Sequence, residues 1–174
     1  MKLPTSLSSA AQATARMAGW TTLGMAALAL ALPAQAQYNQ EIANSMAKCS
    51  AGAGPAVRVN ITDVKASSGK IRVQLYRATK RDWLEKGRWL NRIEVPARAG
   101  SMTVCMPAPG PGTYGIAIRH DINGNGSTDL TKDGGGMSNN PSINVFNLGK
   151  PSHSKVAFSL GDEVKPMTIR MRYM

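Results

Sequence analysis

The sequence predicts an all-β fold, a single antiparallel β-sandwich of about seven strands. Apolar residues recur at every second position in several short runs, which is the pattern of strands with one buried face. Clusters of Gly, Pro, Asn and Ser separate these runs at the spacing typical of sandwiches. No helical crossover lies between the runs, which excludes a parallel α/β fold. We therefore expect an immunoglobulin-like or transthyretin-like topology.

The first two runs predict an antiparallel hairpin. Apolar residues alternate over 57–61 and again over 71–75, with a Ser-Ser-Gly turn between them. Tyr114 follows a Pro-Gly corner, which predicts a tyrosine corner whose hydroxyl bonds back to the chain. The later strands are expected from the same alternation at residues 93–95, 102–106, 114–118, 156–160 and 169–173.

Residues 79–90 interrupt the alternation and predict one short helical segment. Thr79 is followed three residues later by Asp82, and this spacing is a helix-start signal in which the acid replaces the usual Glu. Trp83 and Leu84 would then cover an open end of the core.

The first 36 residues have the parts of a cleavable secretory signal peptide. Lys2 and Arg16 supply positive charge, an apolar stretch runs over 20–32, and small residues at positions 34 and 36 form the cleavage pattern. We expect an irregular lead-in over 37–55 and the β-sandwich domain over 56–174, located in the periplasm or secreted. No stretch after residue 36 is long and apolar enough for a transmembrane segment.

The chain has two cysteines, Cys49 and Cys105, and both lie in the part expected to be exported. An even number of cysteines in an oxidising compartment predicts one disulfide bond. A redox-active pair is the alternative, but the Cys-x-x-Cys spacing is absent.

The chain is strongly basic, with 21 Lys and Arg against 10 Asp and Glu and a net charge of +11 at pH 7. Removal of Lys2 and Arg16 with the signal peptide lowers this charge to +9. Export argues against nucleic acid as a partner. The expected partners are anionic envelope components, namely lipopolysaccharide, glycan or acidic protein, and the alternative is a basic surface with no dedicated partner.

Residues 121–129 match the opening of a calcium-binding loop. Alternate oxygen-bearing side chains converge on one point in such loops, and a glycine at the sixth position permits the sharp turn. The candidate Ca²⁺ ligands are Asp121, Asn123, Asn125 and Asp129.

The same loop departs from the full calcium pattern. Its twelfth position holds Lys132 instead of a bidentate Glu, although Asp133 is a further carboxylate nearby. A weak site is therefore expected. The repeated Asn-Gly is also an ordinary turn sequence, so a metal-free turn remains the alternative.

A second polar stretch contains Ser138, Asn139 and Asn140, which together with His120 are candidates for a ligand-binding loop. These side chains could equally bond their own backbone in Asx turns. His120 beside Asp121 suggests a catalytic base with its orienting acid, with Asp129 as another acid, but adjacent strand residues point to opposite faces.

Two motifs carry a family resemblance. The stretch from Gly112 to Gly126, with its His-Asp-x-Asn-x-Asn-Gly motif, and the Ser-Asn-Asn-Pro motif ending at Pro141 resemble the family defined as domain of unknown function 2141. The resemblance covers about residues 56–173. It implies a bacterial exported β-sandwich and no established activity.

Three functions follow as hypotheses. The first is a non-catalytic binding or interaction module of the envelope with a weak calcium loop. The second is a purely structural β-sandwich without a metal site. The third is an enzyme that uses His120 with Asp121 or Asp129.

Overall fold

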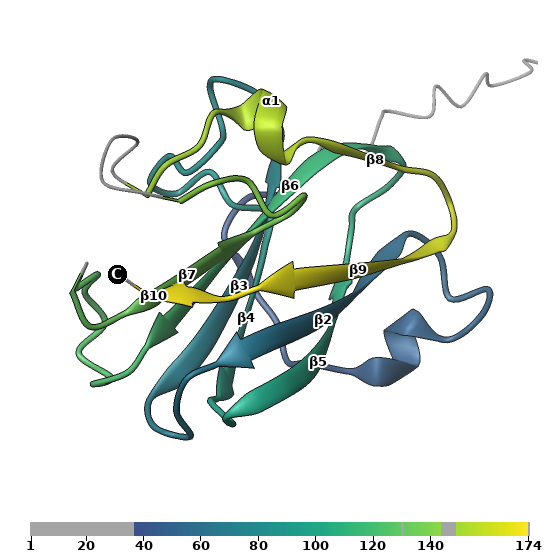
Figure 1. Cartoon of the computed structure of the whole chain (residues 1–174). Helices are drawn as coiled ribbons and strands as arrows, with labels where there is room; N and C mark the ends of the chain where they lie inside the picture. The colour runs from purple at the N-terminus through teal and green to yellow at the C-terminus, as the bar shows by residue number, and fades with distance from the viewer. Residues whose placement is uncertain (1–36, 130, 144–148, 174) are drawn as a thin grey trace, which may run out of the picture. The chain divides into compact units, whose positions relative to one another are not determined.

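The computed structural model describes residues 37–129, 131–143 and 149–173, so the predicted signal peptide lies outside the described residues. The described residues form ten strands in two sheets and belong to one compact unit, Gln35–Met174 (Figure 1). The all-β prediction is therefore confirmed. None of the described helices is long or apolar enough to cross a membrane.

The smaller sheet has the strand order β5-β2-β9, and the larger sheet has the order β1-β4-β3-β6-β7-β10, with β8 also paired to β6. We call these the small sheet and the large sheet. The small sheet comprises β5 (Gly100–Pro107), β2 (Ala56–Val64) and β9 (Val164–Arg170). The large sheet comprises β1 (Gln40–Glu41), β4 (Asn91–Pro96), β3 (Lys70–Arg77), β6 (Gly112–Asp121), β7 (Gly134–Met137), β10 (Arg172–Tyr173) and β8 (Phe158–Leu160).

The pairing is mixed, which corrects the prediction of a purely antiparallel sandwich with about seven strands. β2 pairs in parallel with β9, and β1 pairs in parallel with β4. The predicted final strand is divided between the sheets, because β9 pairs with β2 and β10 pairs with β7 (Figure 1). Met171 lies at this crossing, where its backbone N–H donates to the Thr62 carbonyl at 2.9 Å.

One hydrophobic core lies between the sheets and draws on both. The alternating residues predicted to face inward are buried, which confirms the period-two interpretation of β2, β3 and β6. The predicted hairpin of the first two runs is wrong, because β2 pairs with β5 and β9 whereas β3 pairs with β4 and β6 in the other sheet. The central members of this core are Val57, Val59, Ile61, Ile71, Val73, Leu75, Ile116 and Ile169.

Residues 79–90 form turns and not the predicted helix. The helix-start hydrogen bonds do form, since the Thr79 hydroxyl donates to Asp82 Oδ2 at 2.8 Å and accepts from the Asp82 N–H at 3.2 Å. Leu84 then adopts a positive φ of 58°, a left-handed conformation that cannot continue a right-handed helix. The short helices lie elsewhere, in η1 (Met46–Cys49), within the segment expected to be irregular, and in α1 (His153–Val156).

A second hydrophobic cluster covers part of the outer face of the large sheet. The turn residues Trp83 and Trp89 meet Val156 of α1 there. Gly115 makes this packing possible, because a Cβ at that position would lie 2.8 Å from the Trp83 ring. The cluster comprises Tyr76, Trp83, Trp89, Ala117, Met137 and Val156.

Two local predictions are confirmed. Cys49 and Cys105 form a disulfide bond that ties η1 to β5. The Tyr114 hydroxyl donates to the Gly110 carbonyl at 2.8 Å, which is the bond of a tyrosine corner.

Candidate functional site

The predicted calcium loop joins β6 to β7 and begins at a buried carboxylate. Asp121, the last residue of β6, is only 4% exposed. Its Oδ2 accepts from the Gly126 N–H at 2.8 Å and lies 3.5 Å from Arg119 Nη2. Its Oδ1 is buried and has no hydrogen-bond partner among the described residues. One buried carboxylate oxygen therefore remains available.

The other three predicted ligands are brought together further along the loop. The side-chain amides of Asn123 and Asn125 both donate to Asp129 Oδ2, at 2.8 and 3.0 Å. Asn123 Oδ1 accepts from the Asn125 N–H, and Asn125 Oδ1 accepts from the Ser127 N–H, so both asparagines form Asx turns. Gly124 and Gly126 have positive φ values, as the Asn-Gly turn sequence predicts.

Asp133 joins these residues as a third loop carboxylate. It is buried, and its two oxygens accept from the backbone N–H groups of Ile122 (3.2 Å) and Asp129 (3.0 Å). Lys132, at the position where a calcium loop has Glu, is exposed. No group of three or more His, Cys, Asp or Glu side chains in the described part of the chain is arranged to hold a metal on its own.

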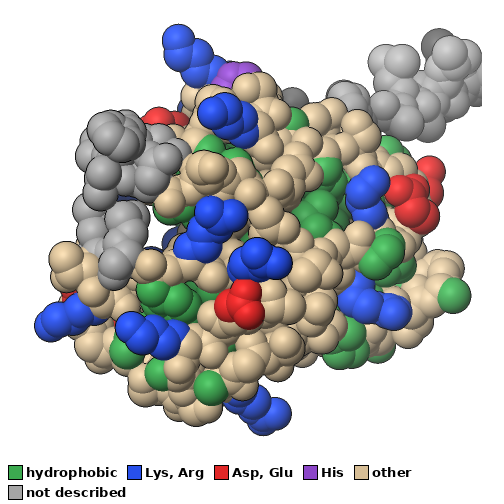
Figure 2. All heavy atoms as spheres, viewed as in Figure 1, with side chains coloured by type: hydrophobic (Ala, Val, Ile, Leu, Met, Phe, Trp, Pro, Cys, Tyr) green, Lys and Arg blue, Asp and Glu red, His purple; other side chains and the backbone are tan. Residues whose placement is uncertain are grey.

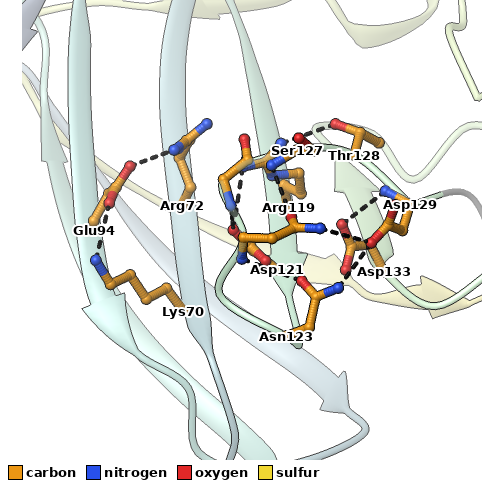
Figure 3. Close-up of polar contacts among 12 residues, drawn as sticks. Lys70, Arg72, Glu94, Arg119, Asp121, Asn123, Ser127, Thr128, Asp129 and Asp133 are labelled. Carbon is orange, nitrogen blue, oxygen red and sulfur yellow. Dashed lines mark hydrogen bonds and ion pairs between the residues drawn. The ribbon is translucent and has the colours of Figure 1, made fainter.

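Arg119 connects the loop to the face of the large sheet. Its terminal nitrogens donate to Thr128 Oγ1 and to the Gly126 carbonyl, both at 2.9 Å (Figure 3). Its Nε is buried without a hydrogen-bond partner among the described residues. Burial and the neighbouring Arg72 lower the pKa of Arg119, although Asp121 acts in the opposite direction.

An open groove of about 690 Å³ lies on the outer face of the large sheet, beside the second hydrophobic cluster. We call it the outer-face groove. One wall is the turn at 84–89, and the other is the loop at 126–128. Its lining residues are Asn39, Arg72, Gln74, Tyr76, Leu84, Glu85, Lys86, Gly87, Trp89, Arg92, Arg119, Gly126, Ser127 and Thr128.

The arginines on the outward positions of the strands divide between the two sheets. Arg72 lies directly opposite Arg119, and Arg119 and Arg172 both face Gly135 in register, so these three share one row on the large sheet. The other two, Arg58 and Arg170, lie on the small sheet. Figure 2, which shows the face with β2 and β9, has Lys and Arg side chains spread over the surface without a single dense patch.

His120 is fully buried and points into the molecule. Its Nδ1 lies 2.7 Å from the Tyr173 hydroxyl, and its Nε2 lies 2.8 Å from the Ser68 carbonyl. Because only an N–H can donate to a carbonyl, Nε2 carries a proton that it donates to Ser68. Neither ring nitrogen bonds Asp121, so the pair suggested as base and orienting acid is not assembled.

The Ser138, Asn139 and Asn140 side chains bond the backbone of other segments. Ser138 Oγ accepts from the Ile116 N–H and donates to the Val156 carbonyl. Asn140 bonds the Thr168 carbonyl and the Arg170 N–H on β9, taking the place of a neighbouring strand. Asn139 donates to the Lys155 and Ala157 carbonyls. These contacts hold the β7 end against α1 and β9, and the ligand-binding role of the three residues stays a prediction.

The sequence does not predict the groove, because its lining residues come from segments that are far apart along the chain. Arg72 and Arg119 alternate with buried apolar residues, but their direct opposition depends on the β3–β6 register, which alternation alone does not determine.

The family model for uncharacterised proteins conserved in bacteria, domain of unknown function 2141, matches residues 59–168. This match spans the strands from β2 to β9 and includes the whole 121–133 loop. No curated protein and no solved structure is significantly similar to the chain. The chain therefore belongs to this bacterial family, domain of unknown function 2141.

Proposed function

We propose that the protein is an exported, non-catalytic binding or interaction module, built on an immunoglobulin-like or transthyretin-like sandwich, whose 121–133 loop binds Ca²⁺ weakly. The observation that carries the proposal is the buried Oδ1 of Asp121, which has no hydrogen-bond partner among the described residues. A buried polar atom left unpaired costs about 1–3 kcal/mol. A hard cation with a preference for oxygen ligands would remove that cost.

The rest of the loop supplies further oxygens. Asp129 and Asp133 are carboxylates, and Asn123 and Asn125 already meet at Asp129 through their amides. Each asparagine Oδ1 accepts one N–H in its Asx turn and keeps a second lone pair for a cation. Arg119 Nη2 lies 3.5 Å from Asp121 Oδ2, and its positive charge would repel a cation bound there. We therefore place the affinity in the weak range of extracellular calcium modules, about 10⁻⁴–10⁻³ M.

A purely structural role is the second candidate, and the hydrogen bonds within the loop favour it. The two asparagine amides satisfy Asp129 Oδ2 with hydrogen bonds in the absence of a metal, and the Asx turns close the loop on their own. Under this alternative the loop only connects β6 to β7.

Export to the periplasm or the medium is part of the proposal. Its support is the Cys49–Cys105 bond, since structural disulfides persist in oxidising compartments. The proposed partners are anionic envelope components such as lipopolysaccharide, glycan or acidic protein, and the excess of basic residues supports them.

The test is the thermal midpoint of the chain from residue 37 in EDTA, in a few millimolar Ca²⁺ and in the same concentration of Mg²⁺. At ten times the dissociation constant, linkage predicts about 1.4 kcal/mol of stabilisation, or a rise of about 3–6 °C. Asp129→Asn should abolish the rise, whereas Asp162→Asn, an exposed aspartate outside the loop, should leave it intact. If Ca²⁺ does not raise the thermal midpoint above that in Mg²⁺, the loop is an ordinary turn without a calcium site.

A further inference from the structure

Two arginines stand directly opposite each other in the outer-face groove. Arg72 on β3 and Arg119 on β6 are register partners, and such residues have Cβ atoms about 4.5–5.5 Å apart (Figure 3). Like charges in this arrangement destabilise a sheet. An arrangement that opposes stability in this way is expected at functional sites, where a bound counter-charge removes the repulsion.

The acidic neighbours only partly neutralise the pair. Arg72 Nε bonds Glu94 Oε1 at 2.6 Å, and its terminal nitrogens have no hydrogen-bond partner among the described residues. Arg119 is 3.5 Å from Asp121, while its Nε is buried and unpaired. Four cationic side chains line the groove, with Glu85 as the acid among the lining residues: Arg72, Lys86, Arg92 and Arg119. Each of the three arginines is also paired with one acid, Arg72 with Glu94, Arg92 with Glu41 and Arg119 with Asp121, so what the groove offers an anion is the guanidinium N–H groups that these pairs leave unbonded.

The floor of the groove adds a neutral donor. Tyr76 is 4% exposed and packs edge-on against Trp83, and its hydroxyl has no hydrogen-bond partner among the described residues. Burial raises the pKa of Tyr76 to about 12, even though Arg92 and Arg72 act to lower it. The hydroxyl therefore keeps its proton throughout the physiological range and can donate to an anion.

We propose that the outer-face groove binds an anionic glycan, with Arg72 and Arg119 holding an oxyanion group, phosphate or carboxylate, carried by a sugar chain. The inference deepens the proposed binding role and rests on that role, independently of the calcium site. Arginine is the side chain best suited to such groups, because its planar donors match the oxygens of phosphate and carboxylate.

The size and the uncharged lining indicate a sugar chain as the carrier. At about 690 Å³ the groove has the volume of a site for a whole organic ligand, not for a single ion. Asn39, Gln74 and Thr128 line it with amides and a hydroxyl, which both donate and accept. Such groups pair with sugar hydroxyls placed on either side of the oxyanion.

The experiment is isothermal titration calorimetry on the chain from residue 37 in EDTA with five probes. These are an oligogalacturonate, a phosphorylated oligomannose, the neutral maltohexaose, inorganic phosphate and an oligoglutamate. We expect millimolar or tighter binding of at least one anionic saccharide, weakened by added salt. The preferred saccharide identifies carboxylate or phosphate as the source of the oxyanion. We expect no detectable heat with maltohexaose and weaker binding of inorganic phosphate.

Substitutions then locate the site. Arg72→Gln should weaken binding about tenfold or more, as expected for a lost charge-assisted contact, and Tyr76→Phe should weaken it several-fold with the ring packing retained. Arg98→Gln is the matched control, because it removes an exposed guanidinium outside the groove and should change affinity less than about twofold.

Four outcomes would overturn the proposal. The first two are absence of binding by both anionic saccharides at millimolar concentration and equal affinity for charged and neutral saccharides. The other two are wild-type affinity in Arg72→Gln and binding of oligoglutamate as tight as that of the anionic glycans. Since these titrations contain EDTA, their result is separate from the calcium test, and failure of one leaves the other to stand.

Discussion

The disulfide bond permits a quantitative prediction about stability. Cys49 and Cys105 are fully buried, and 56 positions separate them in the sequence. The bond therefore closes a loop of about 57 residues that contains β2, β3 and β4. In the chain-entropy model, closing a loop of this length stabilises the folded state by about 4 kcal/mol relative to the open unfolded chain. Replacement of both cysteines by alanine should remove most of this stabilisation of the folded state.

The assay is urea unfolding at pH 7, followed by the fluorescence of Trp83 and Trp89. With a slope of about 2 kcal/mol per molar urea, the midpoint of the double variant should fall by about 2 M. A reductant should lower the midpoint of the wild type by a similar amount and leave that of the double variant unchanged. A double variant within about 1 kcal/mol of the oxidised wild type would refute the reasoning, because it would mean that the loop is already restricted in the unfolded chain.

Two further predictions concern titrating side chains. Burial opposes ionisation of Asp82, but hydrogen bonds from Thr79 and Tyr38, with two nearby arginines, lower its pKa overall. The ionised Asp82 carboxylate therefore stabilises the folded protein fully above about pH 4, and this stabilisation is lost as pH falls through the pKa of the folded state. Asp82→Asn should lower the free energy of unfolding, measured in urea, by about 1–3 kcal/mol at pH 7 and by less at pH 3. Tyr76, with a pKa of about 12 against about 10 unfolded, stabilises the protein below pH 10 and loses that effect as pH rises toward 12. Tyr76→Phe should remove the last step of the ultraviolet phenolate titration, and survival of that step would disprove the assignment.

The features that sequence predicts here are local ones. The alternation of β2, β3 and β6 depends only on the period of a pleated strand, and each inward residue follows from its neighbours two positions away. The tyrosine corner at Tyr114 likewise joins residues four apart. The pairing of Cys49 with Cys105 follows without any knowledge of the fold, because the chain has only these two cysteines.

The features that sequence does not predict depend on which distant segments become neighbours. β2 and β9 are about a hundred residues apart, and alternation is the same for parallel and antiparallel partners. The Thr79–Asp82 hydrogen bonds that start a helix do form. No helix follows, because Trp83 packs into the second hydrophobic cluster and Leu84 adopts a left-handed conformation. Asn140 was considered for ligand binding, and its contacts with β9 depend on a strand edge about thirty residues away.

Arg119 belongs to both proposed sites, and this links them thermodynamically. Its guanidinium holds the loop through Gly126 and Thr128, lies 3.5 Å from Asp121, and also lines the groove. A cation on Asp121 would withdraw the one carboxylate paired with Arg119 and leave more of its positive charge for a glycan oxyanion. If both sites bind as proposed, we expect positive coupling, and because coupling between binding sites is reciprocal, the glycan would raise the calcium affinity by the same factor. A loop that binds Ca²⁺ only weakly alone would then bind it more tightly when the groove is occupied.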